Sequence, residues 1–332
     1  MKRTGNSIDY YGIYESEMGK IENKLNHLLI KKEPRSLYEP CSYFLSNGGK
    51  RIRPYLVLLS AKAVGGKLSD VYNAAIAVEI VHNFTLVHDD IMDNSDKRRG
   101  MPTLHKKYDI STAILAGDSM IALAYESLAK DCKKNIGNIF SIFTHGIIEV
   151  CEGQSLDKEY EIRNNVSINE YIKMIYKKTA ALIEMSCRIG AEISEAPADQ
   201  LRAVANFGRN LGIAFQIQDD LLDITGKEDS FGKTIGSDLI EGKKTFLFLR
   251  AMEKTTGKEK QALMQVIENK GIERIEIPRF EKIYYDFGII EDAEREIVKY
   301  TKLALRNLNS LPDKCGRDLM RRLANILIHR NK

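Results

Sequence analysis

Two clusters of aspartates in this sequence share one spacing, in which two adjacent carboxylates are followed by a third after two residues. They are Asp89, Asp90 and Asp93, and Asp219, Asp220 and Asp223. On a helix, residues four apart lie one turn apart on the same face, so the first and last carboxylates of each triad repel one another. A divalent cation offsets that repulsion. Hard carboxylate oxygens suit Mg²⁺ or Mn²⁺, which completes its shell with water and phosphate oxygens.

A solvated acidic helix end explains a single triad as well as a metal site does, because acidic pairs are common on helix surfaces. The second triad has apolar neighbours, with Ile213, Phe215 and Ile217 before it and Leu221 and Leu222 within it. Carboxylates inside so apolar a helix are costly unless they are paired or bound to a metal. The two copies together therefore favour a metal site, in which triads that face one another hold divalent ions against a diphosphate.

Basic residues form several separate clusters along the chain. They are Lys50, Arg51 and Arg53 after two glycines; Lys97, Arg98 and Arg99 beyond the first triad; Lys177 and Lys178 before Thr179; Lys233; and Lys243 with Lys244. Any one cluster is typical of a solvated face. Arginine also suits bidentate contacts to phosphate oxygens, and lysine acts as a point charge. Carboxylates for Mg²⁺ together with several cationic clusters indicate a site for two diphosphates.

Other kinds of catalytic residue are less evident. His82 precedes Asp89 by seven residues, two helical turns on the same face, and is a candidate phosphate contact. His88 is equally well explained as a core residue. The sequence has no G-x-S-x-G elbow, no Gly-rich phosphate loop ending in G-K-[ST] and no G-x-G-x-x-G. The motifs therefore predict that metal ions and basic side chains bind diphosphates, and that no side chain acts as a nucleophile.

Composition excludes some classes of protein. The chain has 332 residues, 50 Lys+Arg against 46 Asp+Glu, and a net charge of +4, which is too nearly neutral for a nucleic-acid-binding surface over the whole protein. The five cysteines are scattered without a C-x-x-C pair, which indicates free thiols in a reducing compartment. No apolar run is long enough for a signal peptide or a transmembrane helix. We therefore expect a cytoplasmic protein without stable membrane insertion.

Helical periodicity runs through nearly the whole sequence, and alternating runs typical of strands are essentially absent. The expected helices cover roughly residues 13–28, 36–47, 54–64, 69–95, 110–131, 136–158, 168–194, 198–224, 243–254, 258–269, 281–309 and 313–329, with a loop at 94–100. The prediction is an all-α protein, one domain over residues 1–332 with ten or more helices. The triads would lie on two of the longest helices.

In their order along the chain, these motifs resemble those of the trans-isoprenyl diphosphate synthases, which are chain-elongating prenyltransferases. The matching runs are G-G-K-R-x-R-P at 48–54, H-D-D-I-M-D at 88–93 with R-R-G at 98–100, K-T at 178–179, F-Q-x-x-D-D-x-x-D at 215–223 and G-K-x-x-G-x-D-x-x-x-G-K-x-T at 232–245. The resemblance implies the isoprenoid synthase fold, a helical bundle around a central cavity. It also implies condensation of isopentenyl diphosphate with allylic diphosphates (dimethylallyl, geranyl or farnesyl) in trans.

The resemblance assigns roles to individual residues. The diphosphate of isopentenyl diphosphate would be bound by Lys50, Arg53, His82 and Arg99. About three Mg²⁺ ions per active site, or Mn²⁺, would be held by Asp89, Asp93 and Asp219, with Asp90 and Asp223. The allylic diphosphate would be bound by Arg98, Lys178, Lys233 and Lys243, with Thr179 and Gln216 as polar neighbours and Asp220 completing the catalytic set. The family further implies a homodimer and only transient membrane contact through the lipid product.

Two residues before the first triad would set the length of the product. Thr85 lies one turn from Asp89 on the same helix face, and Phe84 lies at its side, about 7 Å along the axis. An aromatic at the fifth position before the motif closes the cavity in the family. Phe84 with the small Thr85, and no insertion within D-D-I-M-D, resembles the archaeal type of geranylgeranyl diphosphate synthase. A farnesyl or mixed product remains an alternative, as does Phe84 as an ordinary core residue.

Three other functions compete with this interpretation. A terpene cyclase shares one aspartate triad, but its second metal motif differs from Asp219, Asp220 and Asp223. A His-Asp metal phosphohydrolase would explain His88 and Asp89 and leave the basic clusters unexplained. A non-catalytic subunit of a heteromeric prenyl synthase would be expected to have lost a triad or its cations, and neither is lost here.

Overall fold

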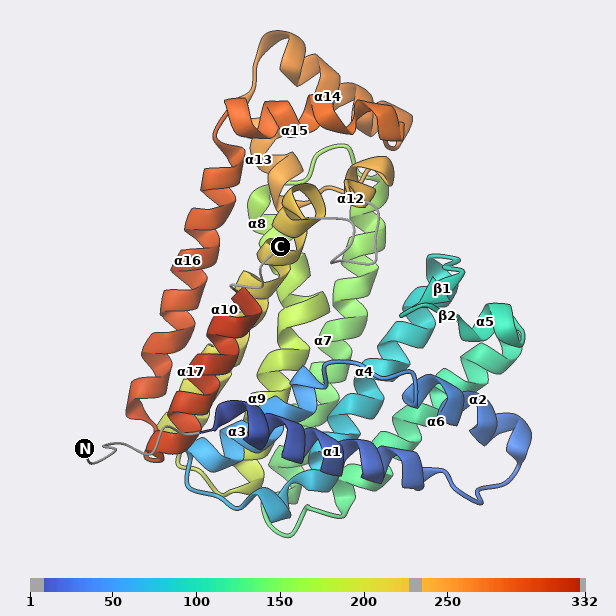
Figure 1. Ribbon diagram of the computed structural model, residues 1–332, viewed down its shortest axis with the longest axis vertical. Helices are drawn as coiled ribbons and strands as arrows, with labels where there is room; N and C mark the ends of the chain where they lie inside the picture. Colours follow the sequence, from blue (N-terminus) through green and yellow to red (C-terminus); the bar gives the residue numbers. More distant parts are fainter. Residues whose placement is uncertain (1–8, 227–234, 329–332) are drawn as a thin grey trace, which may run out of the picture. The chain divides into compact units, whose positions relative to one another are not determined.

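A computed structural model describes residues 9–226 and 235–328, and nearly all of its regular structure is helical (Figure 1). The helices are α1 (Tyr10–Leu28), α2 (Arg35–Leu45), α3 (Ile52–Ala63), α4 (Tyr72–Met92), α5 (Leu104–Lys107), α6 (Ile110–Ala129), α7 (Ile136–Ile162), α8 (Ile168–Ile175), α9 (Ala181–Ile193), α10 (Ala198–Thr225), α12 (Ser237–Ile240), α13 (Phe246–Lys254), α14 (Gly257–Asn269), α15 (Ile277–Asp286), α16 (Ile289–Asn307) and α17 (Lys314–Ile328). The predicted all-α class is confirmed. No helix of the described residues is long and apolar enough to cross a membrane.

The chain divides into two compact units. The first comprises Met1–Ser141, Ser186–Leu201 and Pro312–Met320, and the second comprises Ile142–Met185, Arg202–Leu311 and Arg321–Lys332. The first unit contains the first aspartate triad, and the second unit contains the other. A single domain over residues 1–332 stays a prediction.

In the first unit, α4 is the central element and packs mainly against α6 and α3 (Figure 1). Its amino end is capped by the buried carboxylate of Asp131, which accepts a hydrogen bond from the backbone N–H of Ala74 at 2.8 Å. Near its other end, α6 lies so close that a Cβ added to Gly117 would come within 2.4 Å of His88 Nε2. These contacts place the last turn of α4, which carries Asp89 and Asp90, at a defined position in the unit.

A short hairpin that the sequence analysis missed begins within the predicted loop at 94–100 and extends beyond it. Strands β1 (Lys97–Arg98) and β2 (Met101–Pro102) pair in antiparallel fashion. Arg99 and Gly100 connect them with φ values of +52° and +79°, which is the backbone that a two-residue type I′ turn requires. Strands this short leave no alternating pattern, and as the two strands of the described residues they agree with the prediction that strands are essentially absent.

In the second unit, the predicted helix at 168–194 is interrupted. Residues Tyr176–Ala180 form a π-helical turn, η2, between α8 and α9. Gly153 of α7 lies against this turn, because a Cβ there would come within 2.1 Å of the backbone nitrogen of Lys178. Single π turns inside α-helices are frequent at functional sites. The interruption therefore marks the position of Lys178 and Thr179.

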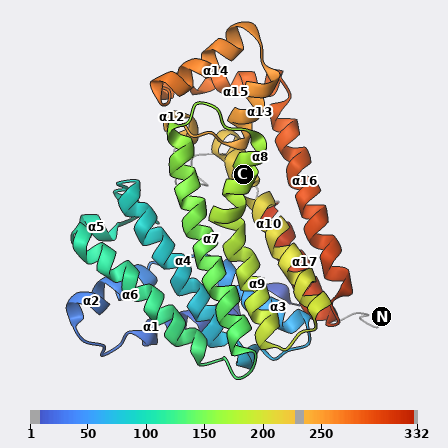
Figure 2. The ribbon, with the colours of Figure 1, turned by 180° about the vertical axis from the view of Figure 1, so that it is seen from behind.

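The rest of the second unit packs around α13, which contacts α16, α14 and α8 (Figure 2). The predicted helix at 281–309 is two helices, because Gly288 with φ +65° ends α15 and begins α16. Phe280 and Tyr284 of α15 are buried in this part of the unit.

Candidate active site

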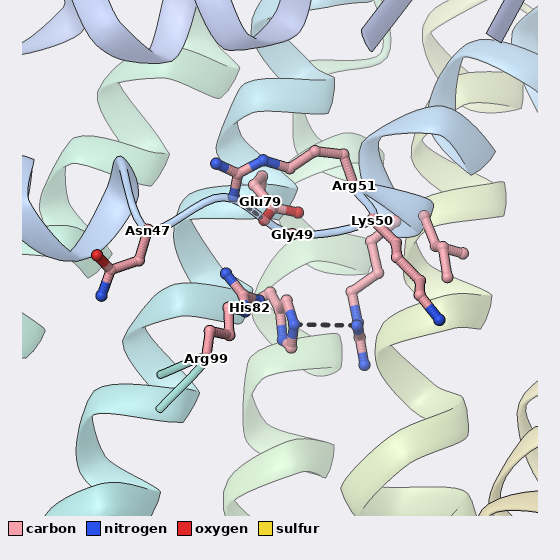
Figure 3. Close-up of a pocket in the computed structure, with 9 residues that line it drawn as sticks. Asn47, Gly49, Lys50, Arg51, Glu79, His82 and Arg99 are labelled. Atoms are coloured by element: carbon pink, nitrogen blue, oxygen red, sulfur yellow. Dashed lines mark hydrogen bonds and ion pairs between the residues drawn. The ribbon is translucent and has the colours of Figure 1, made fainter. Parts of the chain in front are cut away.

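A cavity of about 510 Å³ in the first unit collects the predicted residues of one diphosphate site (Figure 3). Its lining includes Lys50, Arg53, His82 and Arg99, together with Asn47, Gly49, Arg51, Ile52 and Glu79. The four predicted residues come from a loop, the start of α3, the middle of α4 and the β1–β2 turn. Tertiary packing thus brings together four residues that the sequence grouped only through a resemblance.

His82 is a neutral hydrogen-bond partner of Arg53 in this cavity. Arg53 Nη1 and His82 Nε2 lie 3.1 Å apart, shown as a dashed line in Figure 3. A guanidinium has only donors, so the imidazole nitrogen accepts. Burial and then the Arg53 charge hold the pKa of His82 well below its usual range. A cavity rich in fixed positive charge therefore keeps His82 uncharged and uses it to orient Arg53.

The glycine pair before Lys50 allows Arg99 to approach the loop. Gly48 and Gly49 have φ values of +67° and +138°, which strain any other residue. Arg99 Nη1 donates to the carbonyl of Gly48, and its guanidinium carbon would lie 3.0 Å from a Cβ at Gly49. A side chain at Gly49 would displace Arg99, so the glycine is part of the site.

The three carboxylates of the first triad have different surroundings. Asp90 is only 1% exposed, and its Oδ1 accepts a hydrogen bond from Arg98 Nε at 2.7 Å. Burial raises the pKa of Asp90, and Arg98 opposes that rise. Asp89 is half-buried and Asp93 is exposed. Asp90 and Arg98 thus form an ion pair with one another. The role of Asp90 as a metal ligand and the role of Arg98 as an allylic diphosphate contact stay predictions.

The carboxylates of the second triad also differ in their surroundings. Asp220 is buried and accepts hydrogen bonds from Tyr171 Oη, from the backbone N–H of Phe246 at 3.0 Å and from Gln216 Nε2 at 3.2 Å. Burial, and then the nearby Asp238, raise the pKa of Asp220 to about 7. Asp223 accepts from the Ser237 hydroxyl and from the Asp238 N–H.

The π turn brings three other predicted residues toward the second triad. Lys178 forms an ion pair with Asp157 of α7 at 2.6 Å. The Thr179 hydroxyl donates to Gln216 Oε1 at 2.9 Å, and the Gln216 amide donates in turn to Asp220. This hydrogen bond joins Thr179 to Gln216, and their predicted role beside the allylic diphosphate stays a prediction.

Two further lysines of this unit, Lys243 and Lys233, were predicted to bind the allylic diphosphate. Lys243 forms an ion pair with Glu241 at 2.6 Å and lies 3.8 Å from Asp238. Burial lowers the pKa of Lys243, but these carboxylates outweigh it and leave the pKa raised. Lys233 lies outside the described residues. Its predicted role stays a prediction.

The two residues predicted to set product length both lie on α4. Phe84 is buried, and its ring packs edge-on against His88 with centroids 4.8 Å apart. The Thr85 hydroxyl donates to the carbonyl of His82 at 2.8 Å. Their roles stay predictions.

Comparison with known proteins decides the family. The sequence model of the polyprenyl synthetase family matches residues 34–283. The chain belongs to the polyprenyl synthetase family. It is 40% identical to the geranylgeranyl pyrophosphate synthase of Geoglobus acetivorans over 94% of this chain and 96% of that one. It is 39% identical to the geranylgeranyl diphosphate synthase of Saccharolobus solfataricus over 98% of this chain and 100% of that one.

Solved structures agree with this assignment. The crystal structure of geranylgeranyl pyrophosphate synthetase from Pyrococcus horikoshii superposes with a TM-score of 0.89 at 34% identity, covering 97% of this chain and 99% of that chain. The isoprenoid synthase fold predicted from the motifs is confirmed, and so is the class of enzyme, a trans-prenyltransferase.

The carboxylates of this polyprenyl synthetase fit a divalent metal. Both triads lie at the carboxyl end of their helix, where the helix dipole is negative and clustered carboxylates are destabilised unless a cation is near. Among the described residues, no group of three or more His, Cys, Asp or Glu side chains could hold a metal ion by itself. Mg²⁺ is usually bound by one or two carboxylates, with water and phosphate oxygens as its other ligands. Asp89 and Asp93 of the first unit therefore suit it as a partial donor set, and so, taken by itself, does Asp219 of the second unit.

The sequence analysis of this family member missed several residues of the site. Glu79 lines the cationic cavity three residues before His82, and that helical spacing was a usable signal. Asp238 lies in the G-x-D of a quoted motif and donates its N–H to Asp223. Tyr171 and Asp157 belong to no motif recognised in the sequence, so only tertiary structure shows their contacts with Asp220 and Lys178.

Proposed function

We propose that this protein condenses isopentenyl diphosphate with allylic diphosphates in trans to give geranylgeranyl diphosphate. The observation that carries the proposal is the cavity in which Lys50, Arg53, His82 and Arg99 converge. A lone anion binder would need only such a cavity. The triads at the ends of α4 and α10, and the relatives named geranylgeranyl diphosphate synthases, support the full reaction.

Isopentenyl diphosphate would be bound with its diphosphate in the cationic cavity. Three of the lining side chains are arginines and one is lysine, against the single carboxylate of Glu79. Guanidinium groups bind phosphate oxygens through charge-assisted, often bidentate hydrogen bonds. Because His82 is neutral, it adds direction to Arg53 without adding charge.

The allylic diphosphate would be bound by Lys178 and Lys243, with Lys233 and Arg98. Mg²⁺ would be held by Asp89 and Asp93 in the first unit and by Asp219 and Asp223 in the second, about three ions in all. When bound, the metal neutralises charge on the departing diphosphate. The lysines add to that neutralisation as fixed point charges that need no reorganisation during the reaction.

The chemistry follows from these charges. The bond between C1 and oxygen of the allylic diphosphate breaks, and the oxygen keeps the electron pair. The isopentenyl double bond attacks the resulting allylic cation, and a proton then leaves the adduct for the released diphosphate. The Thr179 hydroxyl hydrogen is donated to Gln216, so the Thr179 oxygen keeps its lone pairs to stabilise the cation.

The protein would act as a homodimer in the cytoplasm. Ile110, Ile114 and Leu115 of α6 are exposed, with Leu115 59% exposed, and large apolar side chains on one helix are typical of a partner interface. The free cysteines of the described chain support a reducing compartment.

The test of the proposal is elongation itself. Purified protein with Mg²⁺, isopentenyl diphosphate and dimethylallyl, geranyl or farnesyl diphosphate should yield geranylgeranyl diphosphate, separated by chain length on reversed-phase chromatography. EDTA should abolish the product, and added Mg²⁺ should restore it. A farnesyl product would support the shorter-chain alternative. Failure to extend any primer would reject the synthase.

Phe84 provides a test of product length. Phe84→Ala removes a buried ring beside the first triad, so we expect products longer than geranylgeranyl diphosphate in the same assay. Loss of a buried aromatic costs roughly 3–5 kcal/mol of folding free energy, so Phe44→Ala, also buried in the first unit, is the matched control. Unchanged product lengths in a folded Phe84→Ala protein would identify Phe84 as an ordinary core residue.

A further inference from the structure

Helix α1 lies outside the part of the chain that matches the family model, yet it holds the loop of the cationic cavity. The match begins at residue 34, whereas α1 ends at Leu28. Within the first unit, the Tyr14 hydroxyl donates to the carbonyl of Lys50 at 2.6 Å. Glu22 accepts from Arg51 Nε at 2.7 Å and from Nη2 at 3.2 Å. Two side chains of α1 thus contact adjacent residues of one loop.

Arg51 is bound by protein groups on several sides. Its side chain is 1% exposed, and besides Glu22 it donates to Glu79 Oε1 at 2.6 Å and to the carbonyl of Leu45 at 2.8 Å. Figure 3 shows Arg51 turned toward Glu79, whereas Lys50 extends away from both. Two carboxylates balance the Arg51 charge, so Arg51 holds the loop and leaves phosphate binding to its neighbours.

The loop that carries Lys50 has a backbone conformation that needs contacts with the rest of the protein to be stable. Gly48, Gly49 and Arg51 all have positive φ values, and at Arg51 the value is +42°. A non-glycine residue in this region costs free energy and persists only where its surroundings hold it. Immediately after Arg51, α3 begins at Ile52 and carries Arg53. The direction of Lys50 and the start of α3 therefore depend on the contacts of Arg51 and of the Lys50 carbonyl.

We propose that Tyr14 and Glu22 are positioning residues for isopentenyl diphosphate, acting through the Lys50 carbonyl and Arg51. This inference rests on the proposed function, which places the diphosphate of that substrate in the cavity. Neither residue touches the substrate. They hold the loop so that Lys50 and Arg53 meet the diphosphate without reorganising. Helix α1 thereby supports the substrate site without lining it.

The experiment compares two variants of the full chain, Tyr14→Phe and Glu22→Gln, with controls on the same helix. Tyr14→Phe removes the hydrogen bond to the Lys50 carbonyl. Glu22→Gln removes the negative charge and one of the two acceptors for Arg51, and both variants nearly keep the size of the side chain. We expect each to raise KM for isopentenyl diphosphate by about threefold to tenfold, and the double variant by more. KM for the allylic diphosphate and kcat at saturation should stay within about twofold of the wild type. Tyr11→Phe and Glu15→Gln, both exposed on α1, should change none of these values.

A merely structural role of α1 predicts a different result. If KM for both substrates rises together with a lower melting temperature, or if KM for isopentenyl diphosphate does not change, the positioning role is overturned. Arg53→Ala separates this failure from failure of the proposed function. If Arg53→Ala raises KM for isopentenyl diphosphate and the α1 variants do not, only the positioning role is lost. If Arg53→Ala has no effect either, the assignment of the cavity to that substrate fails.

Discussion

Replacing Asp89 or Asp219 with alanine should lower kcat by at least about a thousandfold while the far-ultraviolet circular dichroism stays helical. Each substitution removes a predicted metal ligand, and with it the neutralisation of the departing diphosphate. Losing one preorganised electrostatic group of this kind costs about 10²–10³ in kcat in other enzymes, and the loss of a metal costs more. Neither residue is fully buried, so the fold should survive. Rates come from a radiolabelled isopentenyl diphosphate assay at saturating substrates.

The control for these variants is a carboxylate outside the triads. Asp199 is exposed in the first turn of α10, the helix that carries Asp219, and Asp199→Ala should leave kcat within about twofold. Asp96→Ala serves the first triad, because Asp96 is 82% exposed three residues beyond Asp93. Near wild-type rates in both triad variants would remove the argument for metal binding by the aspartates.

Asp90 and Asp220 differ from the other aspartates of the two triads because they are buried, 1% and 5% exposed respectively. Asp90 pairs with Arg98, and Asp220 accepts three hydrogen bonds from Tyr171, Phe246 and Gln216. Each triad therefore combines two less buried carboxylates with one buried carboxylate that holds the helix end against its surroundings. The D-D-x-x-D spacing predicted the first and last carboxylates on one helix face, but it could not show that the middle one is buried.

Much of the fold could be predicted because most helices bury one face. The periodicity that predicts 69–95 and 198–224 corresponds closely to α4 and α10, since apolar residues recur at helical spacing where those helices pack. The interruption at Tyr176–Ala180 was not predictable from that spacing. The turn lies against Gly153, a residue of another helix. A close contact with a neighbouring element leaves no pattern in the segment that makes it.

The candidate site was predictable to the extent that its residues lie in recognisable motifs. Lys50, Arg53 and Arg99 were grouped with His82 through the family resemblance, and the cavity brings them together. Tyr14 and Glu22 lie in an ordinary amphipathic helix and carry no local signal. Their contacts with the loop depend on how α1 packs against α2, α3 and α4.

The near-neutral composition is consistent with this site. The net charge of +4 comes from opposed local excesses, with carboxylates at the ends of α4 and α10 and cations around the cavity. A site that binds Mg²⁺ needs negatively charged side chains, and a site that binds diphosphates needs positively charged ones. A global charge balance therefore says little about function in a protein whose ligands are themselves a cation and an anion.

The second large effect is expected at the cationic cavity. Arg53→Ala should raise KM for isopentenyl diphosphate about tenfold to a hundredfold, because a hydrogen bond between two charged groups contributes about 1.5–3 kcal/mol. Lys50→Ala should act in the same direction. KM for the allylic diphosphate should change little, since its described predicted contacts Arg98, Lys178 and Lys243 do not line this cavity.

Two comparisons make this prediction specific. Lys67→Ala removes an exposed lysine of the same unit and should leave both KM values unchanged. Arg53→Lys keeps the charge but loses the planar guanidinium that His82 Nε2 orients, so its effect should be intermediate. Because the pKa of His82 lies well below its usual range, protonation of His82 should not alter KM for isopentenyl diphosphate between pH 6 and 8. An Arg53→Ala protein whose KM for isopentenyl diphosphate equals that of the wild type would show that this substrate binds elsewhere.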